Sequence, residues 1–349
     1  MIYLHYYETE SEYAEGRSTD YEEPWTSFTE ETERVHYNKT REEKLLGTPL
    51  TIQALGSGTF SWSTIGSRTN IQYSKNGGER TTLYSGTTIS LVDGDELQFF
   101  CSVSATTYCG ATMSCTADFN LKGNIMSLLY GDSFADKETL PPNTWEFQKL
   151  FANNTTLISA GDLKLPSKNL EDQCYSNMFS GCTSLEVAPE LPATGLAYSC
   201  YGGMFHGCTS LKNAPILPAT TLANRCYESM FYECTSLESA PELPATAATE
   251  NCYSYMFYWC TSLESAPVLP ILNLAKSSYA AMFRGCTNLK YVKAMFITTI
   301  TSPSYSVSLN QWMNGVSATG KFVKNSQAQW NITGVSGIPD GWEVELVSE

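Results

Sequence analysis

The chain has 349 residues, of which 42% are hydrophobic, and its formal net charge is −15. A chain of this length and hydrophobic content can build folded cores in two or three domains. The negative charge repels phosphate backbones and anionic membrane surfaces, so we expect no nucleic-acid partner. No segment approaches 18 consecutive apolar residues, and we therefore expect no membrane insertion.

The N-terminal segment, residues 1–47, is predicted to be an acidic arm. Its first 46 residues hold 12 Asp or Glu against 5 Lys or Arg, together with six tyrosines. Because the segment shows little hydrophobic periodicity, we expect it to need a partner surface to become ordered. The first residues have neither the basic start nor the apolar run of a secretory signal peptide. This pattern favours a protein that stays in the cytoplasm or leaves the cell by lysis.

Residues 48–122 contain short alternating apolar runs, for example Thr59 to Trp62 and Glu96 to Phe100. Turn signals separate these runs at Asn76-Gly77-Gly78 and Asp93-Gly94-Asp95. Short strands with hairpin turns between them predict a small antiparallel β-sandwich. Residues 123–149 are expected to link this domain to the next one and to cap its first repeat.

A 26-residue period dominates residues 150–300, where four blocks share the pattern MFxxCTSLxxAPxLP. Such self-similarity predicts a stack of repeats that form one continuous structure. Two ladders with this spacing mark the register: Cys182, Cys208, Cys234, Cys260 and Cys286, and Met178, Met204, Met230, Met256 and Met282. Residues 301–349, a Gly-rich tail with scattered aromatic residues, are predicted to be a C-terminal cap that covers the last repeat.

Each repeat is predicted to contain one short strand and one helix. A proline near the strand, such as Pro241, removes one ladder donor, so the strand must be brief. A set of apolar residues lies at i, i+4, i+5 and i+8, as on one face of a helix: Cys226, Met230, Phe231 and Cys234. The predicted fold class is therefore an α/β leucine-rich-repeat solenoid. One repeat cannot fold alone, so we expect the Met, Phe, Tyr and Leu columns to be buried between rungs.

The cysteines of the repeats are predicted to be reduced, buried thiols that act as small packing groups. The main column has five members, which cannot all pair, although neighbours lie close enough for a disulfide. A second column changes to Ser278 in the last repeat: Cys174, Cys200, Cys226 and Cys252. The sequence leaves open whether two of the three cysteines Cys101, Cys109 and Cys115 form one disulfide. No C-x-x-C occurs and the three histidines are scattered, so we expect no metal site and no cofactor.

Aromatic residues occupy variable positions of the repeat, where other rungs carry Ser, Gly, His206 or Arg284: Tyr232, Tyr255, Tyr258 and Trp259. Outward aromatics on adjacent rungs predict an exposed patch that stacks on sugar rings or anchors a protein partner. The alternative is that these rings pack against each other or against a neighbouring subunit. A column of charged residues is expected to be a solvated face, with a site for a cation or for sugar hydroxyls as the alternative: Glu186, Lys212, Glu238 and Glu264.

Catalytic motifs are missing from the sequence. There is no G-x-S-x-G, H-E-x-x-H, Walker loop or G-x-G-x-x-G. Three histidines provide little general-base capacity. We therefore expect a protein that is not an enzyme.

The repeat block MF-x-x-CTSL-x-x-AP-x-LPAT resembles the BspA-like leucine-rich repeats of gut Bacteroidetes over about residues 150 to 296. The resemblance extends to segments that are similar to proteins of Bacteroides and their phages: Asp20–Trp25, Val35–Lys39, Gly123–Asp132 and Gly337–Trp342. What the family implies is surface display and adhesion by non-enzymatic binding. The chain shows no leader peptide or lipidated cysteine, unlike secreted members, and this difference favours a virion protein.

The resemblance therefore implies a bacteriophage head or tail fibre-like appendage that displays the repeats for attachment to a host protein or glycan. The arm would dock on other virion subunits through four of its residues: Tyr21, Pro24, Trp25 and Tyr37. We expect a homo-oligomer, with a trimer as one arrangement. The alternatives are a bacterial cell-surface adhesin with a trimmed leader and, more remotely, a glycan-active enzyme that uses Glu186 or Glu238.

Overall fold

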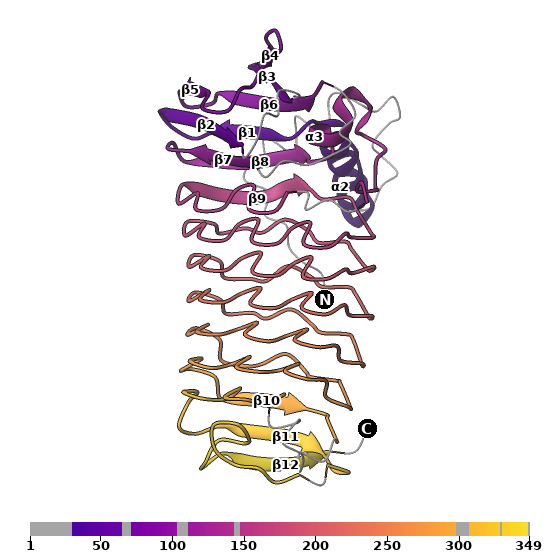
Figure 1. The fold of residues 1–349 in the computed structure, drawn as a ribbon, viewed down its shortest axis with the longest axis vertical. Coiled ribbons are helices and arrows are strands. Elements are labelled where there is room, and N and C mark those ends of the chain that lie inside the picture. Colours follow the sequence, from indigo (N-terminus) through magenta and orange to yellow (C-terminus); the bar gives the residue numbers. More distant parts are fainter. Residues whose placement is uncertain are drawn as a thin grey trace.

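The computed structural model describes residues 30–64, 71–102, 111–142, 147–297, 307–328 and 330–347, with the backbone alone described for residues 30–38. The molecule is elongated, with packed sheets at one end, a long stack of coils, and a small sheet at the other end (Figure 1). The elements in chain order are α2 Glu30–Gly47, β1 Thr51–Ala54, β2 Gly58–Thr64, β3 Ile71–Lys75, β4 Thr81–Thr82, β5 Thr88–Leu91, β6 Glu96–Cys101, β7 Ala111–Cys115, β8 Phe119–Asn124, α3 Ser127–Tyr130, the 3-10 helix η2 Gly131–Ser133, β9 Leu157–Lys164, β10 Tyr291–Ala294, β11 Lys321–Asn325 and β12 Glu343–Val347.

Two sheets built from β1 to β9 form the N-terminal end. The larger has the strand order β4-β3-β6-β1-β8-β9, and the smaller has the order β5-β2-β7. Alternate residues of each strand point inward, so Phe60 and Trp62 of β2 are buried while Ser61 between them is partly exposed. The ring of Phe60 lies 5.2 Å from that of Phe99 in β6, which joins the two sheets into one core.

Strand β9 connects these sheets to the coils, because it pairs in parallel with β8 while the other pairs of the larger sheet are antiparallel. Helix α2 lies across β8 and β9 (Figure 1). Arg41 of this helix forms an ion pair of 2.8 Å with Asp162 of β9. The end of the acidic arm, expected to lack order without a partner, is thus helical and packed against the chain's own sheet.

Residues 147–297 form the structure that we call the coil stack, in which each coil repeats the course of the one before it (Figure 1). Along one side of a coil, every second backbone N–H donates to a carbonyl 25 residues later, in the next coil: Tyr175 to Cys200 at 3.0 Å and Phe179 to Met204 at 2.9 Å. The residues between them close tight turns, as when Met178 donates to the carbonyl of Tyr175 at 3.2 Å. The backbone of each coil therefore depends on its neighbour for half of these hydrogen bonds.

A four-residue backbone rhythm controls which side chains face inward. Every fourth residue has a left-handed conformation, as shown in one coil by Arg225, Ser229 and Glu233, with φ of 58°, 57° and 58°. Buried pairs alternate with partly exposed pairs along this segment: 226–227 and 230–231 are buried, whereas 228–229 and 232–233 are partly exposed. Each coil thus has an inner and an outer surface along this side.

The predicted α/β leucine-rich-repeat solenoid, with a strand and a helix in every rung, is wrong. Strands arranged in three sheets dominate, and the α-helices of the described residues are α2 and α3, which both precede the repeats. The stretch expected to be helical, about Ala223 to Glu233, consists of turns. Its left-handed residues and its coil-to-coil hydrogen bonds are incompatible with an i to i−4 helix. The descriptions of the chain as a leucine-rich-repeat protein and as a solenoid are therefore wrong as well.

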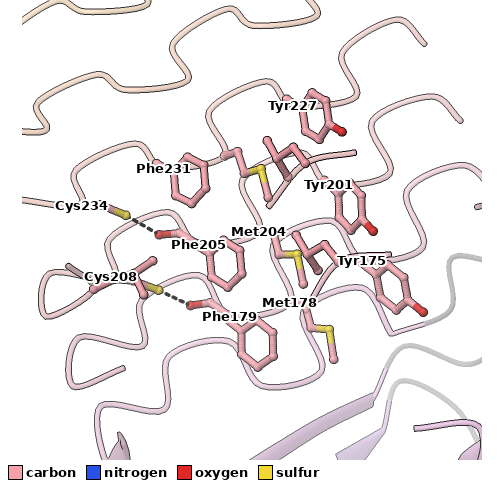
Figure 2. Packing of buried hydrophobic residues seen from close by; sticks show 14 of the residues in the cluster. Tyr175, Met178, Phe179, Tyr201, Met204, Phe205, Cys208, Tyr227, Phe231 and Cys234 are labelled. Atoms are coloured by element: carbon pink, nitrogen blue, oxygen red, sulfur yellow. Dashed lines mark hydrogen bonds between the residues drawn. The ribbon is translucent and has the colours of Figure 1, made fainter. Parts of the chain in front are cut away.

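The interior of the coil stack consists of columns of identical side chains (Figure 2). The five Met residues of the predicted ladder are fully buried. Consecutive Phe rings of the column from Phe151 to Phe283 stack at 5.7 Å, and consecutive Tyr rings from Tyr175 to Tyr279 stack at 5.9 Å. Aromatic stacking adds to the burial of apolar surface, so each coil provides the packing surface for the next.

The five Cys residues of the main ladder are also buried, and each thiol donates to a Phe carbonyl of the preceding coil at 2.9 to 3.2 Å. Figure 2 shows two of these bonds, from Cys208 to Phe179 and from Cys234 to Phe205. The nine cysteines of the coil stack are buried and form no disulfide. Cys101 and Cys115 are buried as well, and Cys109 lies outside the described residues, so the bridge among these three is not tested. Burial raises the pKa of the stack thiols, to about 12 for Cys182, Cys200 and Cys286.

The coil stack ends with β10, which forms a parallel sheet with β11 and β12. Trp312 and Trp330 fold against the end of the aromatic columns, with their indole N–H groups bonded to the carbonyls of Gly337 and Phe296 at 2.9 and 3.0 Å. Trp312 lies 6.4 Å from the ring of Tyr279, which is the last member of the Tyr column. These large rings bury the end of the columns where identical coils stop.

Candidate binding site: an aromatic face on the coil stack

The four aromatic residues singled out in the sequence come together on the outer side of two neighbouring coils. Tyr232 and Tyr258 stack with ring centroids 4.5 Å apart and planes 5° apart. Trp259 lies nearly parallel to Tyr258 at 6.3 Å, and Tyr255 is tilted against it at 5.9 Å. We call these four residues the aromatic face. The rings pack on one another, and they also remain partly or largely exposed at the surface. The expected exposed patch and the alternative of mutual packing therefore apply together.

Two members of the aromatic face occupy left-handed backbone positions. Tyr255 has a φ of 58° and Trp259 a φ of 59°, and the same places two coils earlier are held by Gly203 and Gly207. For a bulky residue this conformation is strained, at a cost of roughly 1–2 kcal/mol. Both residues remain partly open to solvent, with 38% of Tyr255 and 50% of Trp259 exposed.

Glycine in the next coil makes room for the indole of Trp259. Gly285 follows Trp259 by one repeat and has a φ of 79°. A Cβ atom added to Gly285 would lie 2.1 Å from Cδ1 of Trp259, so the indole rests directly on the glycine backbone. This contact fixes the position of the exposed ring.

A histidine and an arginine extend the Tyr232–Tyr258 column at its two ends. His206, one coil before, meets Tyr232 edge-on at 4.6 Å. Arg284, one coil after, places its guanidinium carbon 5.6 Å from the ring centroid of Tyr258. A hydrogen bond to Gln311 holds this guanidinium from the other side. Cation–π contact and hydrogen bonding together orient Arg284 before any ligand arrives.

Four charged residues of both signs belong to the coil of Tyr232 or extend its column: Arg225, Glu228, Glu233 and Arg284. Glu228 accepts a hydrogen bond of 3.2 Å from Arg225, and partial burial raises the pKa of its carboxyl group against the opposing effect of that arginine. Glu233 and Arg284 both act electrostatically on Tyr232, whose pKa is raised first by burial. The four groups carry two negative and two positive charges.

Sequence reasoning did not select Arg225, Glu228 or Glu233. A usable signal was present at position 228, because small residues occupy its place in the other coils: Ser176, Gly202, Ser254 and Ala280. A carboxylate in a column of small side chains is as irregular as Trp259 in a column that carries glycine or glutamate in the neighbouring coils. Within the repeats, the aromatic residues and the charged column from Glu186 to Glu264 were considered as binding positions, but Glu228 was not.

The other predicted site residues lie away from this face or beyond the description. Tyr21, Pro24 and Trp25 lie outside the described residues. Tyr37 belongs to the first part of α2, residues 30–38, of which the structure describes only the backbone. The charged column is exposed, and Glu264 forms an ion pair of 2.7 Å with Lys290 in the next coil. Exposure of the whole column is consistent with the solvated face that was expected.

Within the described ranges, no three His, Cys, Asp or Glu residues gather as metal ligands would. No helix in the same ranges has the length and apolar character needed to cross a membrane. Comparison with protein-family models, with curated proteins and with solved structures finds no match. The chemistry of the aromatic face is therefore the basis for a functional proposal.

Proposed function

We propose that the chain is a non-enzymatic attachment protein that binds a host surface through the aromatic face, as an appendage of a bacteriophage particle. The observation that carries this proposal is the pair Tyr255 and Trp259, which are bulky and exposed in two columns where the other described coils carry no aromatic residue. The left-handed backbone is common to the coils, so the size and exposure of these two side chains distinguish this place from the rest of the outer surface.

The stability of the stack does not require these aromatics. Coils with Gly203 and Gly207 keep the same backbone without strain, and the inner columns are complete in every coil. Exposed Tyr and Trp side chains are the residues that most often dominate binding energy at interfaces. A rigid backbone also reduces the entropy that is lost when the face meets its ligand.

The placement on a phage particle is supported by the resemblance of the repeats and of the flanking segments to Bacteroides and phage proteins. Mass spectrometry of purified particles tests this placement, and the chain should be found among the virion proteins. Absence from particles, with cell fractionation that finds the chain on intact bacteria, would instead support a bacterial adhesin with the same binding face.

Attachment itself is tested by binding of fluorescently labelled chain to a panel of intact Bacteroides strains. The variant Trp259→Gly introduces the residue that the next coil carries at this place, so it removes the ring without disturbing the backbone. We expect this variant to bind more than about tenfold more weakly. A matched control is Tyr84→Ala, which removes a tyrosine that is 59% exposed on the N-terminal sheets and should leave binding unchanged. Equal binding by Trp259→Gly and the unmodified chain would refute the proposal.

A further inference from the structure

We infer that the ligand of the aromatic face is an uncharged glycan chain, which lies along the stack and crosses the coils from His206 to Arg284. This inference rests on the proposed attachment function and adds the chemical class of the ligand. It is drawn from the charges, the ring arrangement and the direction of the column.

The charges of the site favour an uncharged ligand. Arg225 is paired with Glu228, and Glu233 and Arg284 act with opposite sign on Tyr232, so positive and negative groups balance. The whole chain has a formal charge of −15 and repels anionic polymers at a distance. The two arginines would repel a strongly cationic ligand, and the two carboxylates would repel an anionic one.

The mixture of groups matches a ligand rich in hydroxyls. A sugar hydroxyl can donate to a carboxylate and accept from a guanidinium, and the face offers both. The C–H face of a sugar ring packs on aromatic rings, and half of Trp259 is open for such contact. Arg284 is held between Tyr258 and Gln311, so its donors are oriented before binding.

The direction of the column favours a chain over a single sugar. His206, Tyr232, Tyr258 and Arg284 occupy one position in four successive coils. Hydrogen-bonded neighbours in such a ladder lie about 4.8 Å apart, close to the length of one sugar unit in an extended glycan. An extended chain can therefore place successive units over successive coils, where it meets the ring edges of Tyr232 and Tyr258, because the stacked faces of these rings cover each other.

The test uses a strain that the unmodified full-length chain binds and compares untreated, periodate-oxidised and protease-treated cells. Periodate cleaves vicinal diols of glycans, so we expect oxidised cells to lose binding more than about tenfold while protease-treated cells keep it. We expect less than about a twofold change in affinity between 0.05 and 0.5 M NaCl, because screening affects an uncharged ligand little.

Each outcome has a defined meaning. Loss of binding after protease but not after periodate would show a protein ligand and overturn the inference, while the attachment function would stand. Loss after periodate with a tenfold or larger salt effect would show a charged glycan and would also overturn it. Full binding by Trp259→Gly would refute the attachment function itself, whatever the treatment of the cells.

Discussion

Phe231 and Tyr232 are neighbours in the chain, yet they belong to two regions that follow different rules. Phe231 points inward and lies in a column in which every repeat carries the same residue. Tyr232 points outward, and its column runs through Ser180, His206, Tyr258 and Arg284. The ring of Phe231 stacks at 5.7 Å on the rings of the coil before and the coil after. A side chain of another size or shape would not fit both neighbours, so the residue type at this position is restricted.

The difference shows how identical coils can carry an individual site. The inner columns provide a rigid and repetitive support, and the outer positions differ because few contacts restrict them. The aromatic face interrupts an otherwise small and polar outer side in two adjacent coils. Changes to the inner region should therefore alter stability, and changes to the outer region should alter binding.

Alkaline pH should have the largest effect, and it should act on the inner region. Burial raises the pKa of all nine stack thiols above the ordinary value of 9.0. Above about pH 9 the unfolded thiols ionise while the folded ones keep their protons, so stability is complete below pH 9 and falls as pH rises towards 12. Each thiol contributes a loss of about 1.4 kcal/mol per pH unit.

Denaturant unfolding followed by circular dichroism at pH 7.5, 9 and 10 measures this loss. The variant Cys226→Ser removes one thiol and uses the residue that stands at position 278 in the same column. Its stability should fall less steeply with pH. An equal free energy of unfolding at pH 7.5 and pH 10 would contradict the burial of ionisable thiols.

A matched pair of alanine variants should separate the two regions directly. Phe231→Ala leaves a cavity between two coils and should lower the free energy of unfolding by about 3–5 kcal/mol. Tyr232→Ala removes a partly exposed ring and should cost about 1 kcal/mol, the typical value of one aromatic pair. Chemical denaturation of the purified variants measures both. Similar losses would show that the outer ring also supports the fold.

The thiol ladder should respond to the loss of its hydrogen bond. Cys234 donates to the carbonyl of Phe205 at 3.0 Å, so Cys234→Ala should cost about 1–3 kcal/mol through a small cavity and an unpaired acceptor. Cys234→Ser keeps a donor at this place and should cost less. Thermal unfolding of the two variants ranks them, and a less stable serine variant would mean that size matters more than the hydrogen bond.

Gly285→Ala should cost about 1–2 kcal/mol, because Gly285 has a left-handed backbone and the new Cβ would collide with the indole of Trp259. The loss should be smaller in a Trp259→Gly background, where the indole is absent. A double-mutant cycle of unfolding free energies gives the coupling between the two positions. Additive effects would mean that Trp259 does not rest on Gly285.

The 26-residue spacing predicted which residues share a column, since Met178 and Met204 can only keep one register if the coils repeat. It also led to the aromatic residues, because Trp259 breaks a column that is otherwise glycine or glutamate in its neighbours. Both inferences need only the repeat length. They do not depend on the backbone conformation inside a coil.

The helix prediction failed because two backbone patterns give almost the same sequence pattern. Inward pairs every four residues place Met230 and Phe231 four and five residues after Cys226, as a helix also does. The glycines distinguish the coil from a helix, since Gly203 and Gly207 lie four residues apart and both have positive φ. Their left-handed conformation excludes a helix at that place. The sequence signal for it is the spacing of two glycines by four residues, which the helix prediction did not take into account.

The most direct test of the account is one preparation of the double variant Tyr255→Gly and Trp259→Gly, with unfolding free energy and cell binding measured side by side. Relief of left-handed strain offsets the added flexibility of glycine in the unfolded chain and part of the lost contacts with Tyr258, so we predict a loss of stability of at most about 2 kcal/mol. We predict at the same time that binding weakens more than about tenfold. A loss of several kcal/mol of stability, or binding that is unchanged, would contradict the claim that the exposed rings serve attachment rather than folding.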